Sequence, residues 1–333
     1  MPEHISATNP RITRRALLAS AACALLAGRS ALAQQPWPSK TIKFVVPYSA
    51  GGAADALARV IAAELGTRLK QQVIVENKPG ASGSIGAMAV ARSAPDGYTF
   101  LYDATSFTVN PSLIPKLSFD YAKDFVPVGL VARIPTLLVV PADSPIQSVA
   151  DLITRARANP GKLTFASAGN GSAAHLTAEL FSQGLKLGLV HIPYKGGAPA
   201  LTDLAGGQVD MMFSAVAACG PLVKAGKLRA IATAFDRRLP DMPQLPTIAE
   251  SGLPGFNAYE WNALWAPAGT PADIVKRTET ELRAVLAEPG VLKRLTDMGA
   301  LTGSGDSKQL SEFVRGETAK WGRVIKTANI KLD

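Results

Sequence analysis

A glycine-containing segment at residues 47–55, with the sequence PYSAGGAAD, constrains the fold more than any other stretch of the chain. The preceding residues 42–46 form a short apolar run rich in β-branched side chains, which predicts a strand. From Leu57 onward, apolar residues recur every four positions, which predicts a helix face. Gly51 and Gly52 lie between the two, where the absence of Cβ atoms permits a sharp turn. The segment therefore predicts a strand-to-helix junction whose first helical N–H groups favour an anion.

The rest of the chain repeats this alternation of short apolar runs and helical patterns. Strands are predicted at 73–76, 98–102, 163–166, 190–193, 209–213 and 228–233, and helices at 84–92, 149–158, 173–183 and 198–204. Such alternation is typical of a parallel sheet with helices on its faces, in which ligands bind beyond the carboxyl ends of the strands. A second glycine segment, residues 167–175, lies at another strand-to-helix junction. We expect the two glycine segments to face each other across a cleft.

Two long apolar runs, at residues 128–140 and 259–266, predict that the chain crosses between two lobes. The helix that follows the second crossing should begin with Thr270 as its cap. That helix and a last one, which contains Leu310 and Trp321, are expected to pack back on the first lobe. The sequence thus predicts domain 1 at residues 34–138 and 259–333, and domain 2 at residues 139–258.

Residues 1–33 have the features of a cleaved signal peptide. Arg14 and Arg15 precede a short apolar run, and residues 31–33 match the small-x-small pattern of a signal peptidase site. The segment TRRALL also resembles a twin-arginine signal, so export by that route or by the general secretory route stays open. The apolar run is too short to span a bilayer. We therefore expect a soluble periplasmic protein in which Cys219 is the one remaining cysteine.

The charge and the histidines argue against several classes of partner. The whole chain has a formal net charge of +9, but no basic run is interleaved with aromatic residues, so no nucleic-acid partner is expected. Only His175 and His191 remain once residues 1–33 are removed, and their spacing does not suit a metal site. We expect no metal and no cofactor.

A series of motifs in fixed order extends over roughly residues 36–331. They are PYSAGGAAD from Pro47, VENKPGA from Val75, PDGYT from Pro95, FASAGNGS from Phe165, HIPYKGG from His191, GQVD from Gly207, AGKLR from Ala225, LPTIAESG from Leu245 and WAPAGTP from Trp265. Together they resemble the Bug family, the extracytoplasmic solute receptors of tripartite tricarboxylate transporters.

The resemblance implies a two-lobed α/β fold of the type II periplasmic binding protein class, with a ligand cleft between the domains. It implies a periplasmic receptor without catalysis, which captures a small organic acid and delivers it to inner-membrane transporter subunits. We expect a monomer. In that family, main-chain N–H groups and ordered water of the two glycine segments hold the ligand carboxylate. Matched onto this chain, the ligand-binding residues are Tyr48, Ser49, Ala50, Gly51, Gly52 and Asp55, and Ser167, Ala168, Gly169, Asn170, Gly171, Ser172 and His175.

Three further candidates have other grounds. Thr105 and Ser106 follow a predicted strand, so they either reach the cleft or form polar turns. Ser214 stands where many family members have an acidic residue, and Ala54 stands where many have Ser or Thr. The missing acid at position 214 weakens the case for an amino-acid ligand, because an ammonium group favours a carboxylate partner.

Some of these residues also have structural interpretations. An acid in the first turn of a helix suits the helix dipole, which favours a structural role for Asp55. Ser172 is a plausible N-cap. For His175, positioning the second glycine segment and contacting the ligand both stay open. Residues 169–174 fit the G-x-G-x-x-A pattern, but the next strand ends without the acid that a dinucleotide site requires.

Two rival functions remain open on the sequence alone. One is an exported α/β hydrolase that uses Ser167 or Ser172, although no G-x-S-x-G motif is present. The other is a receptor that reports its ligand to a membrane signalling system.

Overall fold

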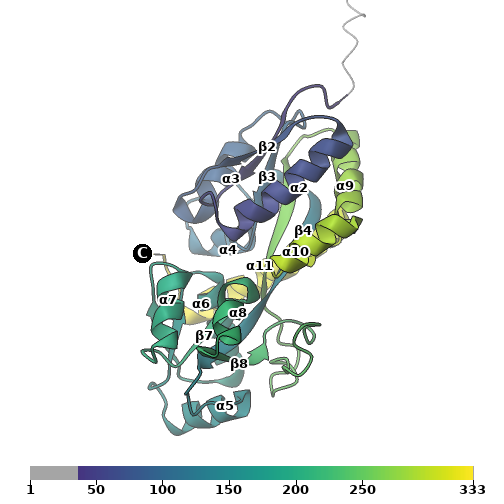
Figure 1. Cartoon of the computed structure of the whole chain (residues 1–333). Helices are drawn as coiled ribbons and strands as arrows, with labels where there is room; N and C mark the ends of the chain where they lie inside the picture. Colours follow the sequence, from purple (N-terminus) through teal and green to yellow (C-terminus); the bar gives the residue numbers. More distant parts are fainter. Residues whose placement is uncertain (1–36, 333) are drawn as a thin grey trace, which may run out of the picture. The chain divides into compact units, whose positions relative to one another are not determined.

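Strands and helices alternate along the computed structural model, which describes residues 37–332 (Figure 1). The chain divides into two units, Met1–Ser39 and Lys40–Asp333, and the fold below is that of the second. The strands are β1 Ile42–Val46, β2 Val73–Asn77, β3 Thr99–Asp103, β4 Phe125–Pro141, β5 Thr164–Ser167, β6 Val190–Pro193, β7 Met211–Ala215, β8 Leu228–Thr233, β9 Tyr259–Pro267 and β10 Leu301–Thr302. The helices are α2 Ala53–Leu69, α3 Ser84–Ala91, α4 Ser106–Leu113, α5 Val149–Ala158, α6 Ala173–Leu185, α7 Gly197–Ala205, α8 Val216–Lys224, α9 Ala272–Ala287, α10 Pro289–Asp297 and α11 Ser307–Ala328, and Ala81–Gly83 forms the 3-10 turn η1.

The strands form one sheet in the order β2-β1-β3-β9-β4-β7-β5-β6, and β10 and β8 also pair with β4. Strands β1, β2 and β3 are parallel, as are β5, β6 and β7. The sheet is therefore parallel at both ends, as the alternation predicted, but mixed at the centre: β9 inserts antiparallel to both β3 and β4, and β4 is antiparallel to β7 and β8. The reason is the path of the chain: β9 returns from the far end of the sheet and therefore enters from the opposite direction.

Strand β4 belongs to both ends of the sheet. Its residues 125–135 pair with β9, and its residues 136–141 pair with β7 and β8. We call β1, β2, β3, β9 and residues 125–135 of β4 the first half-sheet. Residues 136–141 of β4 and strands β5 to β8 form the second half-sheet. The crossings expected at residues 128–140 and 259–266 lie in β4, which changes partners between Pro135 and Thr136, and in β9. The predicted domain boundaries lie in these crossings, after residue 138 and before residue 259. The division into two domains at those residues stays a prediction.

Alternate residues of β4 enter different cores, as the twofold period of a strand requires. Leu138 packs with Phe165 and Phe181 in one cluster, whereas Leu137 packs with Phe235 in another. The last helix, α11, packs on both half-sheets and not only on the first, where the sequence predicted it. Leu310 of α11 packs in the core of the first half-sheet, as expected, but the indole of Trp321 packs with the Leu138 cluster of the second. Helix α11 is long enough to cover both half-sheets.

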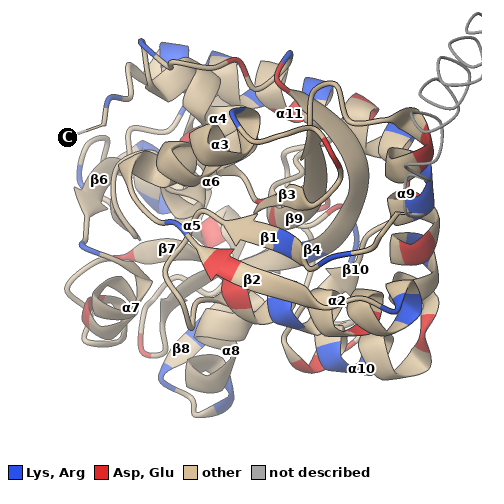
Figure 2. Cartoon of the chain, turned by 90° about the horizontal axis from the view of Figure 1, so that it is seen from above, with Lys and Arg blue, Asp and Glu red and all other residues tan. Residues whose placement is uncertain are grey.

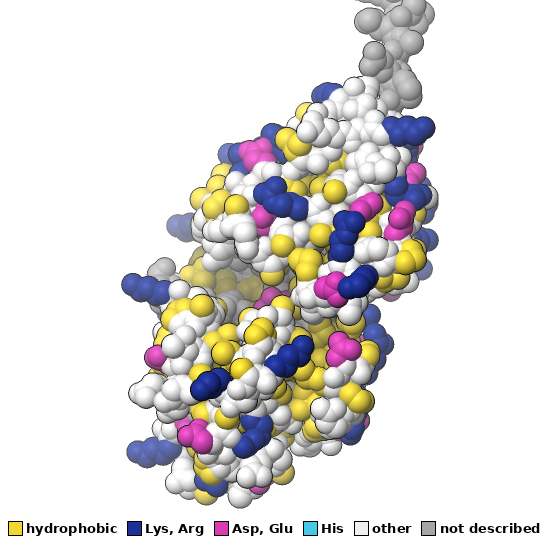
Figure 3. Space-filling model, viewed as in Figure 1, with side chains coloured by type: hydrophobic (Ala, Val, Ile, Leu, Met, Phe, Trp, Pro, Cys, Tyr) yellow, Lys and Arg dark blue, Asp and Glu magenta, His cyan; other side chains and the backbone are white. Residues whose placement is uncertain are grey.

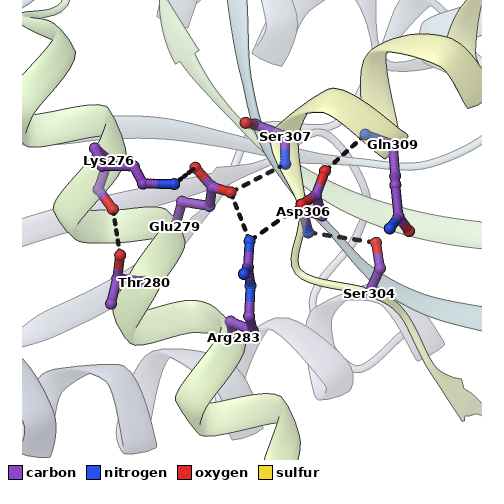
Figure 4. A network of polar contacts seen from close by, with 8 residues as sticks. All are labelled: Lys276, Glu279, Thr280, Arg283, Ser304, Asp306, Ser307 and Gln309. Carbon is purple, nitrogen blue, oxygen red and sulfur yellow. Dashed lines mark hydrogen bonds and ion pairs between the residues drawn. The ribbon is translucent and has the colours of Figure 1, made fainter.

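A network of charged side chains fixes the start of α11 against α9 (Figure 4). The buried carboxylate of Glu279 accepts hydrogen bonds from Lys276 at 3.2 Å and from Arg283 at 2.8 Å. Arg283 also contacts Asp306 at 3.1 Å, and Asp306 caps α11 by accepting from the N–H of Gln309 at 2.8 Å. This network ties the first turn of α11 to the first half-sheet.

Thr270 is not the cap of α9. The N-cap position is Pro271, without a side-chain cap, and the hydroxyl of Thr270 donates instead to the carbonyl of Pro267 at 2.8 Å. Figure 2 shows that both basic and acidic residues occur along α9 and α10, at the outside of the fold. Within residues 37–332, no helix combines the length and apolar character that crossing a bilayer requires. The signal peptide predicted at residues 1–33 lies outside the described residues.

Candidate functional site

A cleft of about 870 Å³ lies where the two half-sheets meet, and residues of both line it. From the first come Tyr48, Ser49 and Gly52, and from the second come Ala168 and Asn170. Figure 3 shows the surface hollowed between the half that carries α2 and α3 and the half that carries α6 and α7. The two glycine segments therefore face one space, as the sequence predicted.

Helix N-termini converge on this cleft. Residues at or next to the start of α2, α3, α4, α6 and α7 all line it. Each of these helices follows a strand of its half-sheet, so their N-termini lie at the carboxyl edge, where the free N–H groups and the positive end of the helix dipole favour an anion. Of these helices, only α6 has a side-chain cap, from Ser172; the N-caps of α2, α3, α4 and α7 make no side-chain cap bond.

Basic side chains do not contribute to the lining. Among the described residues that line the cleft, none is Lys, Arg or His, and Glu260 is the one acid. An anion in this space would have to be held by main-chain N–H groups and by neutral side chains such as those of Ser49, Thr105 and Ser106.

Asp55 holds the first glycine segment in shape. Its buried carboxylate accepts from the N–H of Gly51 at 2.9 Å, from Arg59 at 3.0 Å and from the carboxamide of Asn77 at 3.0 Å. Arg59 is the main reason that the pKa of Asp55 falls to about 2, with the bonds from Gly51 and Asn77 adding to the effect. Asn77 also donates to the carbonyl of Tyr48, which ties the segment to β2.

A buried acid lies beneath the polar wall formed by Tyr48 and Ser106. One oxygen of Asp103 accepts from Ser106 at 2.6 Å, from Tyr48 at 2.8 Å and from the N–H of Ala104 at 2.7 Å. Burial raises the pKa of Asp103 to about 6 against these bonds, and it also raises the pKa of the Tyr48 phenol. Asp103 does not itself line the cleft, but it fixes the hydroxyl groups of Tyr48 and Ser106, which do.

His175 holds the second glycine segment. Its ring nitrogen Nδ1 accepts from the main-chain N–H of Gly171 at 3.1 Å, and its main-chain N–H donates to Ser172 Oγ at 3.3 Å. The buried imidazole stacks on that of His191, with ring centroids 3.7 Å apart. Burial, reinforced by His191, lowers the pKa of His175 to about 4, so the ring is neutral near pH 7. The N-cap role expected for Ser172 is confirmed.

The structure also brings Ser167 and His191 together, which the sequence did not indicate. Ser167 Oγ lies 2.6 Å from His191 Nε2, and the same oxygen accepts from the N–H of Gly169 at 3.1 Å. Ser167 is fully buried, and neither it nor His191 lines the cleft. The pair therefore fixes the end of β5 beneath the second segment.

The structure divides the candidate residues into two groups. Those that line the cleft are Tyr48, Ser49, Gly52, Thr105, Ser106, Ala168, Asn170, Gly171 and Ser172. Those outside its lining are Ala50, Gly51, Asp55, Ser167, Gly169, His175 and Ser214. The buried members of the second group, among them Asp55 and His175, position the lining residues from behind. Ser214 is buried within β7.

Sequence reasoning missed several lining residues. Ser82, Gly196, Glu260 and Asn262 line the cleft, and none was a candidate. For the last two a signal existed: they are polar residues two apart within the otherwise apolar strand β9, and a strand places such residues on one face. Within the described part of the chain, no group of His, Cys, Asp and Glu is arranged to hold a metal ion.

The chain is similar to known solute receptors over most of its length. A family model described as "Tripartite tricarboxylate transporter family receptor" matches residues 57–330. BugT of Bordetella pertussis is 36% identical over 89% of this chain and 91% of its own. Among solved structures, Rpa4515 of R. palustris with adipate is 38% identical and covers 89% of this chain and 100% of its own, with a TM-score of 0.77. MatC of Rhodopseudomonas palustris with bound malate is 34% identical and covers 87% and 100%, with a TM-score of 0.74. These matches confirm the two-lobed α/β fold and the resemblance to the Bug family.

Proposed function

Because the chain belongs to the family of tripartite tricarboxylate transporter receptors, we propose that it captures a small carboxylate solute in the cleft and delivers it to the membrane subunits of such a transporter. The observation that carries the proposal is the lining of the cleft. Helix N-termini from both half-sheets meet there, and no described lining residue is a cation. Main-chain N–H groups are then the donors for the carboxylate.

The N-terminus of α2 is one donor site for that carboxylate. Ala53 and Ala54 line the cleft in its first turn, and no side chain caps the helix. Hydrogen bonds to a charged group contribute about 1.5–3 kcal/mol each. A few such bonds from both half-sheets, offset by the cost of association, are consistent with micromolar affinity, or about 8 kcal/mol. Two related receptors were solved with adipate and malate, which supports a carboxylate ligand here as well.

Ala54 offers a direct test of the anion site. Ala54→Asp would place a negative charge in the first turn, and Ala54→Asn would place a neutral group of the same shape there. We expect the aspartate variant to fold, because an acid suits this end of a helix, and to lose at least about tenfold in affinity for any acid that the protein binds. The asparagine variant should lose far less. Equal losses in the two variants would show that the carboxylate binds elsewhere.

A thermal-shift screen with organic acids and matched neutral amides identifies the solute class. A ligand at about 100 times its dissociation constant stabilises the protein by about 2.7 kcal/mol, which is readily measured as a rise in Tm. If neutral compounds raise Tm and no acid does, the proposal of a carboxylate receptor fails.

A solute held by both half-sheets favours their closed arrangement over an open one. In this proposal, residues 34–138 with 259–333 move as one body and residues 139–258 as the other. Small-angle X-ray scattering with and without the solute tests it, because closure lowers the radius of gyration. An unchanged radius at saturating solute would contradict the closing motion.

The receptor is proposed to leave its solute unchanged. Ser167 has His191 beside it but is buried and does not line the cleft, whereas Ser172 lines the cleft but its Oγ caps α6. Neither serine combines access to the cleft with a neighbouring base, which supports a receptor over a hydrolase. A serine-directed covalent probe that labels either residue would instead support the exported hydrolase. Deletion of the coding region should abolish uptake of the solute, whereas retained uptake with loss of a transcriptional response would support the signalling receptor.

Export and oligomeric state complete the proposal. We propose that residues 1–33 direct export to the periplasm and that the mature protein is a monomer. Replacing Arg14 and Arg15 by lysine blocks export only on the twin-arginine route, so the periplasmic fraction of this variant separates the two routes. Light scattering of the purified protein gives its mass directly.

A further inference from the structure

Glu260 is an unpartnered acid in the lining of the cleft. It is the one Asp or Glu among the described lining residues. Its carboxyl makes no hydrogen bond or ion pair with the rest of residues 37–332. Burial alone raises its pKa, with no cation nearby to oppose that effect. The protein therefore keeps a carboxyl group in a partly buried place and supplies no partner for it, which costs free energy unless a ligand provides one.

The strand register places Glu260 between the two half-sheets. On β9, Ala263 pairs with Asp103, the last residue of β3, so Glu260 lies beyond the carboxyl end of that strand. On the other side Glu260 pairs with Ile134, which also lines the cleft and lies just before β4 passes into the second half-sheet. The carboxyl group therefore faces the space that both glycine segments border.

Asn262 adds a second polar group on the same face of β9, two residues along. It lines the cleft and is almost completely buried, at 2% exposure. Its Oδ1 has no hydrogen-bond partner among the described residues. A carboxamide can turn either its oxygen or its NH₂ group to a ligand, so Asn262 adds hydrogen bonding while Glu260 sets the sign of the charge.

The cleft thus has two electrical poles. The N-termini of α2, α3, α4, α6 and α7 form a positive pole that attracts an anion, and Glu260 forms a negative pole on β9. We propose that Glu260 recognises an ammonium group at the far end of the solute, so that this receptor selects an amino acid or an ω-amino carboxylate and rejects a solute with a second carboxylate. This inference rests on the proposed function, because it requires a carboxylate at the first pole.

The discrimination has a physical cause. In a partly buried cleft, the attraction between an ammonium group and a carboxylate, and the repulsion between two carboxylates, are both stronger than in water. Glu260 alone therefore favours solutes that carry an ammonium group and disfavours solutes that carry a second carboxylate. The departure at Ser214, which argued against an amino-acid ligand, is compensated by an acid from a different strand.

Matched solutes test the inference by calorimetry. β-Alanine, γ-aminobutyrate and δ-aminovalerate differ from succinate, glutarate and adipate only in that an ammonium group replaces one carboxylate. Butyrate, valerate and hexanoate, with a methyl group there, form the neutral series. Aspartate, glutamate and their amides extend the series to α-amino acids. We expect the best amino compound to bind the wild-type protein at least about tenfold more tightly than its matched diacid.

Glu260→Gln keeps the shape of the side chain and removes the charge, and Glu312→Gln on the exposed face of α11 makes the same change in net charge far from the lining. We expect Glu260→Gln to lower the preference for the amino compound by about tenfold or more and to retain its Tm, whereas Glu312→Gln leaves the preference unchanged.

The outcomes separate the two proposals. If acids bind but the diacid is preferred, and Glu260→Gln leaves that preference unchanged, the role of Glu260 is overturned while the carboxylate receptor stands. A diacid preference that disappears in Glu260→Gln would overturn it as well, because the residue would then act as a protonated donor. If no acid of any series binds, both proposals fail.

Discussion

In the first glycine segment the N–H of Gly51 donates to Asp55, and in the second the N–H of Gly171 donates to His175, each acceptor lying four residues ahead in the first turn of a helix. The backbone conformation is similar in the two segments, because Gly51 and Gly171 both have positive φ values, +81° and +72°. The acceptors differ in charge. Asp55 is an anion neutralised by Arg59, whereas His175 is a neutral ring stacked on His191.

The comparison teaches that a loop can present main-chain donors to a cleft while its supporting side chain adds no net charge that would act on the ligand. In the first segment the carboxylate lies behind the loop and Arg59 compensates it. In the second the imidazole is kept neutral by burial. In both segments, the charge of the supporting residue therefore does not cancel the positive end of the helix, α2 or α6, that opens at the cleft.

The largest expected effect comes from removing the charged support. Asp55→Ala leaves Gly51, Asn77 and Arg59 without their shared acceptor. Because the hydrogen bonds from Gly51 and Asn77 to the charged carboxylate contribute about 1.5–3 kcal/mol each, we expect a loss of about 3–5 kcal/mol in the free energy of unfolding, measured by urea denaturation. Solute affinity should fall with it. Asp151→Ala is the matched control, because Asp151 accepts from the N–H of Gln147 in the same geometry at the start of α5, away from the cleft.

For the control we expect a loss of only about 1 kcal/mol and unchanged affinity. If Asp55→Ala and Asp151→Ala have the same effect on affinity, the support of the first glycine segment is irrelevant to binding.

A pH series distinguishes the two supports. The pKa of His175 is lowered to about 4 in the folded state from 6.5, so its contribution to stability is complete above pH 6.5 and is lost as the pH falls to 4, by about 3 kcal/mol. The pKa of Asp55 is lowered to about 2 from 3.8, so its contribution is lost only below pH 3.8. Between pH 6.5 and 4, only the second segment should weaken.

The measurement is the difference in unfolding free energy between the wild-type protein and His175→Gln across this range. A difference is needed because Asp103 has the opposite sign: its pKa is raised to about 6, so its contribution is present below pH 3.8 and is lost as the pH rises to 6. We expect the advantage of the wild-type protein to shrink toward pH 4. Parallel curves would show that His175 does not titrate as the structure indicates.

Alanine at the two glycines should give a smaller and unequal effect. Both Gly51→Ala and Gly171→Ala strain a positive φ, at a cost of about 1 kcal/mol each. A Cβ at Gly171 would also lie 2.6 Å from Leu113 Cδ1, whereas a Cβ at Gly51 meets nothing within 4 Å. We therefore expect Gly171→Ala to lose more stability in urea denaturation. The reverse order would mean that the second segment relaxes more easily than the first.

The smallest effect is expected from the exposed cation of the first support. Arg59→Gln removes the guanidinium next to Asp55, whose pKa should rise toward its ordinary value. The loss of stability should be small and should vanish at high NaCl concentration, because salt screens exposed ion pairs. Arg68→Gln, which breaks the pairs with Glu281 and Glu288 away from the cleft, is the control for Tm. If the loss of stability in Arg59→Gln does not depend on NaCl concentration, the ion pair assigned to Asp55 and Arg59 does not contribute as proposed.

Local patterns predicted the fold class and much of the site. Ranges such as 149–158 and 228–233 agree with α5 and β8, because their periodicity and capping are encoded within each segment. The junctions at residues 47–55 and 167–175 were recognisable because glycine stands between a strand pattern and a helix pattern. The roles of Thr270 and Trp321 were not, because a cap and a packing partner depend on how the neighbouring segments approach.

The sequence by itself determined that strands alternate with helices and that glycine segments open two of those helices, since both properties depend on residues close together in the chain. Tertiary structure decided the rest. It placed Glu260, which lies in an apolar strand far along the chain, in the same cleft as Ser49 and Asn170, and it moved Asp55 and His175 behind the loops. The reason is that β9 returns antiparallel into the centre of the sheet, and no local pattern records where a returning strand inserts.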